Sequence, residues 1–452
     1  MGKLFGTDGI RGKANRFPMD AHTAFAVGQA LTYQLRQEKG DGHRIGVVIG
    51  KDTRISGYMI ESSLEAGVTS MGGDPYLVGV LPTPGIAFIT ESMRADAGVV
   101  ISASHNPFED NGIKIFNGKG RKLSDAQEEV LEALILDKTL PDRAPEATQM
   151  GRAYRIHDAR GRYIQFLKNA FPRDLTMEGM RIAVDVGNGA TYRTAVGALV
   201  ELGAEVDVIH NNPNGFNINN GCGSQYTEDL ERRVLATDSH IGLAFDGDGD
   251  RLIAVDEKGR RITGDQILMI CAYQLQQEGR LDNDLLVTTV MSNFGLKVAC
   301  EKYGIANHRT QVGDRYVLEV MEKLNAAIGG EESGHMIFFS HHGTGDGTLS
   351  ALQLVAVLQR TGKPLSELAK VMDVFPQVLI NIDVTHKPPI EELPEVMKAI
   401  ADVEAKLGDK GRVLVRYSGT QNMCRVMVEG PTKDETQAYC QQIVDAVEKA
   451  LT

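Results

Sequence analysis

The sequence predicts an α/β protein: three similar α/β domains with mixed sheets plus a C-terminal α+β domain, arranged around one central cleft. The chain has 452 residues, and a chain of this length usually divides into several hydrophobic cores. Apolar strands alternate with amphipathic helices before residue 373, which is typical of α/β layers. Residues 373–452 instead read as strand, helix, strand, strand and helix. The predicted domains are therefore 1–155, 156–257, 258–372 and 373–452.

An internal repeat supports the prediction of three similar domains. Each copy begins with an apolar strand that ends in a polar turn, at Ile45–Ile49, Ile182–Val186 and Leu285–Val290. A later strand of each copy runs into a conspicuous loop, at Ser102–Pro107, Asp246–Arg251 and Gly330–His335. Because α/β sheets bind ligands at the carboxyl ends of such strands, we expect the three loops to face one cleft.

Amphipathic periodicity and capping residues place the helices. The clearest are predicted at Thr23–Glu38, Tyr58–Met71, Thr191–Leu202, Asp265–Glu278, Asp314–Leu324 and Leu349–Arg360. A capping box at Ser124 predicts another helix that runs through Ile135. The C-terminal strands are predicted at Gln377–Val384, Arg412–Tyr417 and Arg425–Glu429, with a helix after Pro389 and another at the end. His341 and His342 look like a metal pair, but we interpret them as a loop before a helix that begins near Asp346.

The composition excludes several classes of partner. Acidic residues outnumber basic ones by 60 to 48, giving a net charge of −12, which disfavours nucleic acid and anionic membranes. No apolar run approaches the roughly 18 residues that a membrane span needs. The five cysteines are scattered without a Cys-x-x-Cys pair, as expected of thiols in a reducing cytoplasm. We therefore expect a cytoplasmic protein that binds neither nucleic acid nor membrane.

The segment Asp246–Arg251 carries the strongest local signal, which is for a metal ion. It reads Asp-Gly-Asp-Gly-Asp-Arg, so three carboxylates lie on one side of an extended segment and glycines let the backbone curl. Such oxygen ligands suit Mg²⁺ or another hard cation. An EF-hand is rejected because Leu252–Val255 reads as a strand where that motif needs a helix. A solvated acidic turn is the alternative.

Ser104 is a candidate nucleophile. It follows the apolar strand Gly98–Ile101 in a tight Asn-Pro turn, which can present a hydroxyl to a cleft. A serine hydroxyl is a weak nucleophile, so it needs a base, a metal ion or prior modification. His105 could contact a phosphate there, although a neighbour in sequence often points the other way. A turn that merely reverses the chain remains the alternative.

Basic residues beside glycines form candidate phosphate sites. Exposed backbone N–H groups and planar arginine forks together fit phosphate oxygens, although each such cluster alone is usually a solvated turn. Lys114 could also act as an acid–base group if its pKa were lowered. The clusters contain Arg11, Lys114, and Arg416 with Arg425.

Taken together and in this order, the motifs resemble those of the α-D-phosphohexomutase superfamily. The matching segments are Phe5–Gly12, Ser102–Pro107, Asp246–Arg251, Gly330–His335 and Arg425–Gly430. The resemblance implies an isomerase that moves a phosphoryl group between the 6- and 1-positions of a hexose by way of a phosphoserine. Within the superfamily, the motifs are most similar to those of enzymes acting on glucosamine phosphate, which supply UDP-N-acetylglucosamine and cell-wall synthesis.

The resemblance also implies a role for each site residue. Ser104 would be phosphorylated in the resting enzyme, and one of its phosphoryl oxygens would join Asp246, Asp248 and Asp250 in holding one Mg²⁺ per chain. The transferring group would be surrounded by Arg11, Lys114 and Arg251, with Lys114 as the proton carrier. The sugar hydroxyls would be bound by Glu331, Ser333 and His335. The phosphate that does not react would be bound by Arg416, Ser418, Gly419, Thr420 and Arg425.

In the implied reaction, phosphoserine converts glucosamine 6-phosphate into glucosamine 1,6-bisphosphate, which turns around and returns its other phosphate to Ser104. The implied partner is a small phosphosugar, and the chain would be a monomer or a homodimer. The last loop reads Arg-Tyr-Ser-Gly-Thr-Gln-Asn at residues 416–422, where the family usually ends in Glu-Pro, so its contacts stay open.

Three other functions would also use some of these motifs. A phosphomannomutase or phosphoglucomutase would use the same chemistry on another hexose. A regulator that binds metal and sugar phosphate without turnover has no need of Ser104 and Lys114. A phosphatase would have no reason for four domains around a reoriented intermediate.

Overall fold

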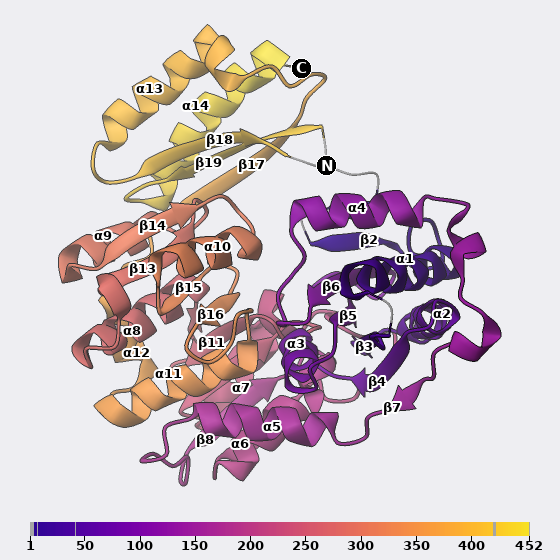
Figure 1. The fold of residues 1–452 in the computed structure, drawn as a ribbon. Coiled ribbons are helices and arrows are strands. Elements are labelled where there is room, and N and C mark those ends of the chain that lie inside the picture. Colours follow the sequence, from indigo (N-terminus) through magenta and orange to yellow (C-terminus); the bar gives the residue numbers. More distant parts are fainter. Residues whose placement is uncertain (1–3, 7, 41, 419–421, 452) are drawn as a thin grey trace. The chain divides into compact units, whose positions relative to one another are not determined.

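The computed structural model describes residues 4–6, 8–40, 42–418 and 422–451. The chain divides into two compact units, which Figure 1 shows in the colours of the sequence. The larger unit comprises Met1–Val290 and Ala306–Ala369, and the smaller one Met291–Ile305 and Lys370–Thr452. Among the described residues, the larger unit contains sheets of seven, five and four strands, and the smaller unit a sheet of three.

The three sheets of the larger unit repeat one topology. In each, three parallel strands and a fourth, antiparallel strand lie in the order second, first, third, fourth. The first sheet uses β3 (Gly46–Lys51), β4 (Asp74–Val80), β5 (Ala97–Ile101) and β6 (Asp110–Asn117). The second uses β8 (Arg181–Asp185), β9 (Glu205–Ile209), β10 (Ile241–Phe245) and β11 (Leu252–Asp256), and the third β13 (Leu285–Thr289), β14 (Ala306–Thr310), β15 (Ile328–Gly330) and β16 (Met336–Phe338). The first sheet is extended by β1 (Phe5–Gly6), β2 (Gly9–Lys13) and β7 (Tyr154–Arg155), and the second by β12 (Arg261–Ile262).

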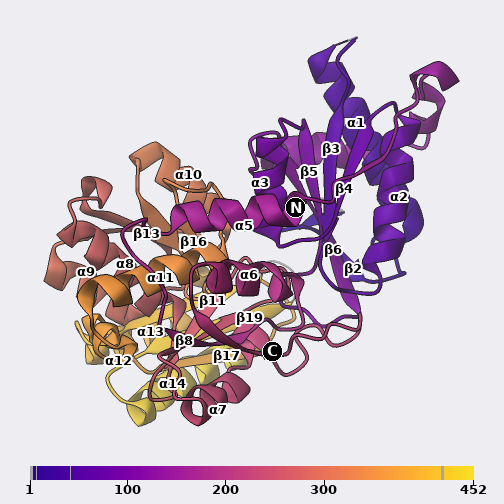
Figure 2. The same ribbon diagram turned by 90° about the horizontal axis from the view of Figure 1, so that it is seen from below.

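This repeat confirms the predicted fold class of similar α/β domains with mixed sheets. The central strands β3, β5 and β10 are buried along their whole length, as expected of strands covered on both faces. In the first sheet, α1 and α2 lie on one face and α3 on the other (Figure 2). The division into two units does not separate the three α/β domains, so their limits stay predictions.

Several helices of the larger unit begin after a residue whose side chain accepts a hydrogen bond from the first turn. Asp20 caps α1, Ser124 and Gln127 form a capping box at α4, and Asp346 caps α11 as expected. The helices are α1 (Ala21–Lys39), α2 (Gly57–Ser70), α3 (Thr83–Ser92), α4 (Asp125–Ile135), α5 (Ala159–Ala170), α6 (Thr194–Glu201), α7 (Glu228–Ala236), α8 (Gly264–Gln277), α10 (Asp314–Leu324), α11 (Gly347–Thr361) and α12 (Leu365–Leu368).

The helix start predicted at Thr191 was wrong. The helix expected from Thr191 begins only at Thr194, because Ala190–Tyr192 form a 3₁₀ turn against the metal loop, where the Ala190 N–H donates to Gly247 O. The helix expected after Pro389 is present and begins at Pro394, since proline suits the first turn of a helix and a 3₁₀ turn precedes it.

The smaller unit has the predicted βαββα order. Its antiparallel sheet β17 (Gln377–Asp383), β19 (Met423–Glu429) and β18 (Arg412–Tyr417) is covered on one face by α13 (Pro394–Leu407) and α14 (Lys433–Leu451) (Figure 1). Helix α9 (Phe294–Tyr303) belongs to this unit because the Phe294 N–H donates to the buried carboxylate of Glu429 over 2.9 Å. Glu429 is also bound by Arg412 at 2.6 Å.

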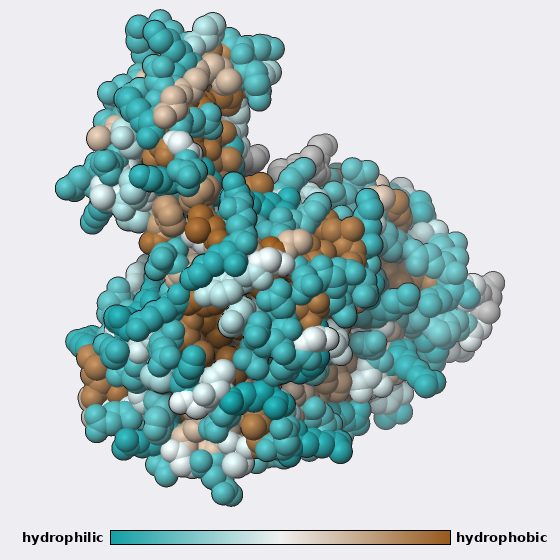
Figure 3. All heavy atoms as spheres, turned by 90° about the vertical axis from the view of Figure 1, so that its left-hand side faces the viewer, coloured by the Kyte–Doolittle hydropathy of each residue, from teal (hydrophilic) through white to brown (hydrophobic). Residues whose placement is uncertain are grey.

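The surface is largely hydrophilic (Figure 3), and the cysteines are buried. Hydrophilic residues cover most of the face shown in Figure 3. In the described part of the chain, no helix combines the length and apolar character required to cross a bilayer. All five cysteines are buried thiols.

Candidate active site

Ser104 lies in the loop after β5, and neighbouring side chains hold its backbone in an unusual conformation. Its φ of 51° falls in the left-handed region, which residues with a side chain rarely adopt. The Ser102 hydroxyl accepts from the Ser104 N–H over 2.9 Å and donates to Asp52 over 2.5 Å. The buried guanidinium of Arg54 donates to the Ser104 carbonyl oxygen over 2.9 Å. These bonds maintain a conformation that costs about 1–3 kcal/mol by itself.

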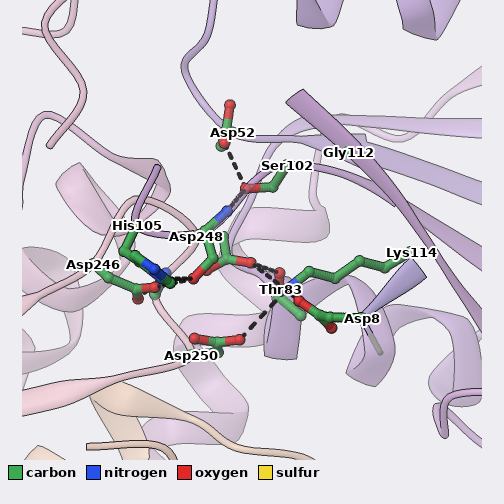
Figure 4. Close-up of polar contacts among 12 residues, drawn as sticks. Asp8, Asp52, Thr83, Ser102, His105, Gly112, Lys114, Asp246, Asp248 and Asp250 are labelled. Atoms are coloured by element: carbon green, nitrogen blue, oxygen red, sulfur yellow. Dashed lines mark hydrogen bonds and ion pairs between the residues drawn. The ribbon is translucent and has the colours of Figure 1, made fainter. Parts of the chain in front are cut away.

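The Ser104 hydroxyl contacts the predicted metal loop. It donates to Asp246 Oδ2 over 2.6 Å, and His105 Nδ1 lies 3.4 Å from it; Figure 4 shows His105 beside Asp246. Burial, and then the charge of Arg251, lower the pKa of His105 to about 3. The imidazole is therefore neutral near pH 7 and can accept a hydrogen bond.

The three aspartates of the loop after β10 converge. One carboxylate oxygen from each of Asp246, Asp248 and Asp250 lies within 4.8 Å of the others, and all three residues are buried. Gly249 has a φ of +73°, and a Cβ atom there would lie 2.4 Å from Thr191 Cγ2, so the turn requires glycine. The structure thus brings together the three carboxylates that the sequence predicted.

The electrostatics of this loop fit a divalent cation. Burial, and then the charges of Asp250 and Asp248, raise the pKa of Asp246 well above its ordinary value. The Oδ1 atoms of Asp248 and Asp250 are buried and have no hydrogen-bond partner among the described residues. A cation held by these oxygens would relieve both costs, and Mg²⁺ prefers such ligands.

Lys114 projects from β6 toward the same carboxylates (Figure 4). Its Nζ lies 2.9 Å from Asp248, 3.2 Å from Asp8 and 3.6 Å from Asp250. Burial disfavours the ammonium, but these carboxylates outweigh burial and raise the pKa of Lys114 well above its ordinary value. The sequence left open a lowered pKa for Lys114, but the structure raises it, so Lys114 is charged.

Arg11 and Arg251 both place a positive charge near His105. Arg11 lies in β2 and pairs with Asp8. Arg251 Nε lies 3.9 Å from Asp250 Oδ1, and its backbone forms an antiparallel bridge with His335. The side chains are 28% and 22% exposed, and the buried Nε atom of each has no hydrogen-bond partner among the described residues, so each arginine has an unused donor that suits a phosphoryl oxygen.

The predicted sugar loop joins β15 to β16 and is bound to its neighbours at both ends. Glu331 Oε1 accepts from the Gly313 N–H over 3.1 Å. His335 is buried, and its Nε2 lies 3.4 Å from Asp314 Oδ2. The Ser333 hydroxyl is buried and has no hydrogen-bond partner in the described part of the chain. The loop therefore offers the carboxylate of Glu331, the hydroxyl of Ser333 and the imidazole of His335, and its last residue bridges Arg251.

The arginines predicted to bind the second phosphate lie in the smaller unit. Arg416 and Arg425 are directly opposite each other on β18 and β19. Burial, and then the charge of Arg425, lower the pKa of Arg416. Because like charges in this position destabilise a sheet, the pair suits an anion that both can bind.

The loop after β18 is anchored at its start. The Ser418 N–H donates to Met423 O over 2.9 Å, and the Ser418 carbonyl accepts from Lys387 Nζ over 2.9 Å. Gly419 and Thr420, which were predicted to bind the same phosphate, lie outside the described residues.

Several residues beside the site were not predicted from the sequence. The Thr83 hydroxyl donates to Asp248 Oδ2 over 2.7 Å, and Asn219 Nδ2 donates to the Ser104 carbonyl over 2.8 Å. Asp8 stands inside the glycine-rich opening motif, so that motif contained a signal for it. Nothing local marks the other residues, because their contacts join distant segments; they are Asp52, Arg54, Thr83, Lys122, Asn219 and Asp314.

Four family models match successive parts of the chain, and all describe parts of phosphoglucomutase/phosphomannomutase. Alpha/beta/alpha domain I matches residues 2–142, domain II 161–259, domain III 263–375 and the C-terminal domain 379–446.

Curated relatives match along the whole chain. The chain is 68% identical over 451 residues to the phosphoglucosamine mutase of Syntrophobacter fumaroxidans, and the match covers 100% of both chains. It is 57% identical over 451 residues to the phosphoglucosamine mutase of Syntrophus aciditrophicus, again with 100% of both chains covered.

Solved structures share the fold. A phosphoglucomutase/phosphomannomutase family protein from Burkholderia thailandensis has a TM-score of 0.80 at 24% identity, covering 98% of this chain and 96% of that one. The N-acetylphosphoglucosamine mutase of Aspergillus fumigatus, solved in complex with GlcNAc-6P and magnesium, has a TM-score of 0.70 at 17% identity, covering 100% and 96%.

Proposed function

We propose that this chain, which belongs to the phosphoglucomutase/phosphomannomutase family, interconverts glucosamine 6-phosphate and glucosamine 1-phosphate. The observation that carries the mutase chemistry is the 2.6 Å contact between the Ser104 hydroxyl and Asp246 in a loop of buried carboxylates. The choice of glucosamine is supported by the 68% identity to a phosphoglucosamine mutase.

Ser104 is the proposed phosphoryl carrier. A phosphoserine at this position gives up its phosphoryl group to the free hydroxyl of glucosamine 6-phosphate: the serine O–P bond breaks and a sugar O–P bond forms. Glucosamine 1,6-bisphosphate results, turns around, and returns its other phosphoryl group to Ser104 Oγ. The sugar hydroxyl loses a proton in this step and the serine oxygen gains one; Lys114 Nζ carries the proton between them.

Asp246, Asp248 and Asp250 are the proposed ligands of one Mg²⁺, together with an oxygen of phosphorylated Ser104. Bound there, the ion would neutralise charge on the phosphoryl oxygens, which is the main requirement of phosphoryl transfer. Arg11 and Arg251 present guanidinium N–H groups to the same oxygens, and the neutral His105 accepts a hydrogen bond beside them.

The remaining residues bind the sugar and its other phosphate in this proposal. Glu331, Ser333 and His335 accept or donate hydrogen bonds to the ring hydroxyls, and the unpartnered Ser333 hydroxyl is available to do so. Arg416 and Arg425 bind the phosphate that does not react, with Ser418, Gly419 and Thr420 supplying the adjacent loop. We place the reaction in the cytoplasm, where buried thiols such as these persist.

A coupled assay of three substrates tests the proposal. We expect kcat/KM for glucosamine 6-phosphate to exceed the values for glucose 6-phosphate and mannose 6-phosphate. A ratio of glucosamine to glucose at or below one would overturn the substrate assignment while leaving the family unchanged.

A second experiment tests which carboxylate binds the amine at C2 of glucosamine. Glu332 is exposed on the sugar loop and is the candidate acceptor for a protonated amine. Glu332→Gln should lower the glucosamine-to-glucose ratio by about tenfold or more, since a lost charge-assisted hydrogen bond costs about 1.5–3 kcal/mol. The control is Glu319→Gln, which alters an exposed carboxylate on α10. An unchanged ratio in Glu332→Gln would remove Glu332 from the explanation.

A further inference from the structure

Lys122, which follows β6 in the first α/β domain, is a largely buried cation between two carboxylates. Its side chain is 13% exposed. Its Nζ donates to Asp8, near the start of the chain, and lies 2.5 Å from Asp314 Oδ2, at the first residue of α10 in the third α/β domain. The lysine therefore joins two segments that each lie beside the candidate active site.

On one side, Asp8 connects Lys122 to the proposed proton carrier. The Oδ2 atom of Asp8 lies 3.2 Å from Lys114 Nζ, and Figure 4 shows the two side chains together. The other carboxylates that contact Lys114 are the proposed metal ligands Asp248 and Asp250. A cation bound to those two would share their charge, which leaves Asp8 as the carboxylate outside the metal loop that holds Lys114.

On the other side, Asp314 connects Lys122 to the sugar loop. Asp314 Oδ2 lies 3.4 Å from His335 Nε2. The preceding N–H, of Gly313, donates to Glu331 Oε1 over 3.1 Å. Gly313 and Asp314, the segment that Lys122 anchors, thus contact the sugar loop at its first and last parts, Glu331 and His335.

We propose that Lys122 is a positioning residue: it holds Asp8 against Lys114 and Asp314 against His335, so that one buried cation locates both the proton carrier and the sugar loop. The proposal rests on the proposed function for its kinetic consequence. Removing the ammonium leaves two largely buried carboxylates that lose their shared partner, and both move toward solvent or toward other cations. A misplacement of about 1 Å in such a site can cost on the order of 100-fold in rate.

The adjacent residue offers a matched control. Arg121 also joins the first α/β domain to α10, through an ion pair with Glu322. These side chains are 36% and 34% exposed, so the pair should contribute little. Arg121→Met therefore removes a similar cation and a similar link between the two domains without touching Asp8 or Asp314.

The first experiment compares steady-state kinetics of three variants in the full-length protein with Mg²⁺. We expect Lys122→Met to lower kcat and raise KM, reducing kcat/KM by about 10- to 100-fold. Arg121→Met should stay within about twofold of wild type. Lys122→Arg should recover most of the loss, because a cavity of about 200 Å³ beside Lys122 can accommodate the larger guanidinium. Equal kinetics for Lys122→Met and Arg121→Met would overturn the proposal.

The second experiment needs no substrate. Acylation of Lys114 by acetic anhydride, followed by peptide mass spectrometry of the Mg²⁺-loaded protein, reports how firmly Lys114 is held. Lys114 should react faster in Lys122→Met than in wild type or Arg121→Met, and Lys122→Arg, the milder change, provides the comparison if Lys122→Met does not fold. Identical labelling of Lys114 in all these proteins contradicts the proposal. If wild type turns over no hexose 6-phosphate, the proposed function fails, and the labelling result alone decides the role of Lys122.

Discussion

The Ser104 hydroxyl donates a hydrogen bond to Asp246 Oδ2 over 2.6 Å, although 142 residues separate the two in the chain. The contact joins the loop after β5 in one sheet to the loop after β10 in another. It places a hydroxyl that could carry a phosphoryl group against the carboxylates best suited to a hard cation.

Replacing Ser104 by alanine should lower the kcat of the mutase reaction by about a thousandfold or more, because the phosphoryl carrier is lost. Intact mass should show one exchangeable phosphoryl group on wild type and none on the variant. Ser63→Ala is the control, since that hydroxyl donates to Met59 O within α2. Undiminished turnover of Ser104→Ala would sink the covalent mechanism.

Removing the metal should abolish activity, and Mg²⁺ should restore it better than Zn²⁺, because the three aspartates form a hard-ligand set. Asp248→Asn should lower kcat more than it raises KM, since it removes one ligand charge from the reacting centre. Asp174→Asn, which changes a carboxylate that is 64% exposed, should leave the kinetics unchanged. Full activity in chelated, metal-free buffer would refute the metal assignment.

Arg54→Met should destabilise the protein by about 3–5 kcal/mol, because it leaves the buried Asp52 carboxylate without its ion-pair partner. Arg54 Nε lies 3.1 Å from Asp52 Oδ2, and both side chains are fully buried. Urea unfolding measures the change. The double variant with Asp52→Asn should recover part of the loss, because the uncompensated charge is gone; a double variant less stable than Arg54→Met would contradict this account.

His342 should make stability depend on pH. Burial lowers its pKa to about 4, and its Nε2 donates to the Pro84 carbonyl over 3.1 Å. Its unfolded-state pKa is about 6.5, so between pH 6.5 and 4 the unfolded chain binds a proton that the folded chain does not. The stabilisation is therefore fully present above pH 6.5 and declines as the pH falls toward 4, by up to about 3 kcal/mol.

Urea unfolding at pH 7.5 and pH 5 tests this dependence. His342→Gln should make it smaller without removing it, because His105 also has a lowered pKa, whereas His22→Gln, at an exposed histidine of α1, should leave it unchanged. A slope in His342→Gln equal to that of wild type would show that other groups cause the pH dependence.

Much of the fold was predictable because its signals are local. Continuous apolar strands, amphipathic helices and capping residues identify their own elements, and the strand order of α/β repeats then places the following loops at one edge of each sheet. The family resemblance carried by those loops is confirmed by the four matching domain models. The helix start predicted at Thr191 was wrong because Ala190–Tyr192 form a 3₁₀ turn against the metal loop, and no local pattern records that contact with a distant segment.

The sequence by itself determined the three loops, the three aspartates that converge, and the serine before them, since each lies within a few consecutive residues. Only the tertiary structure decided that Asp8 and Lys122 connect Lys114 to Asp314, and that carboxylates raise the pKa of Lys114 instead of burial lowering it. The physical reason is that a charge feels every group within a few ångströms, whichever part of the chain supplies it. Such neighbours come from separate domains, and no local pattern in the sequence records which of them will meet.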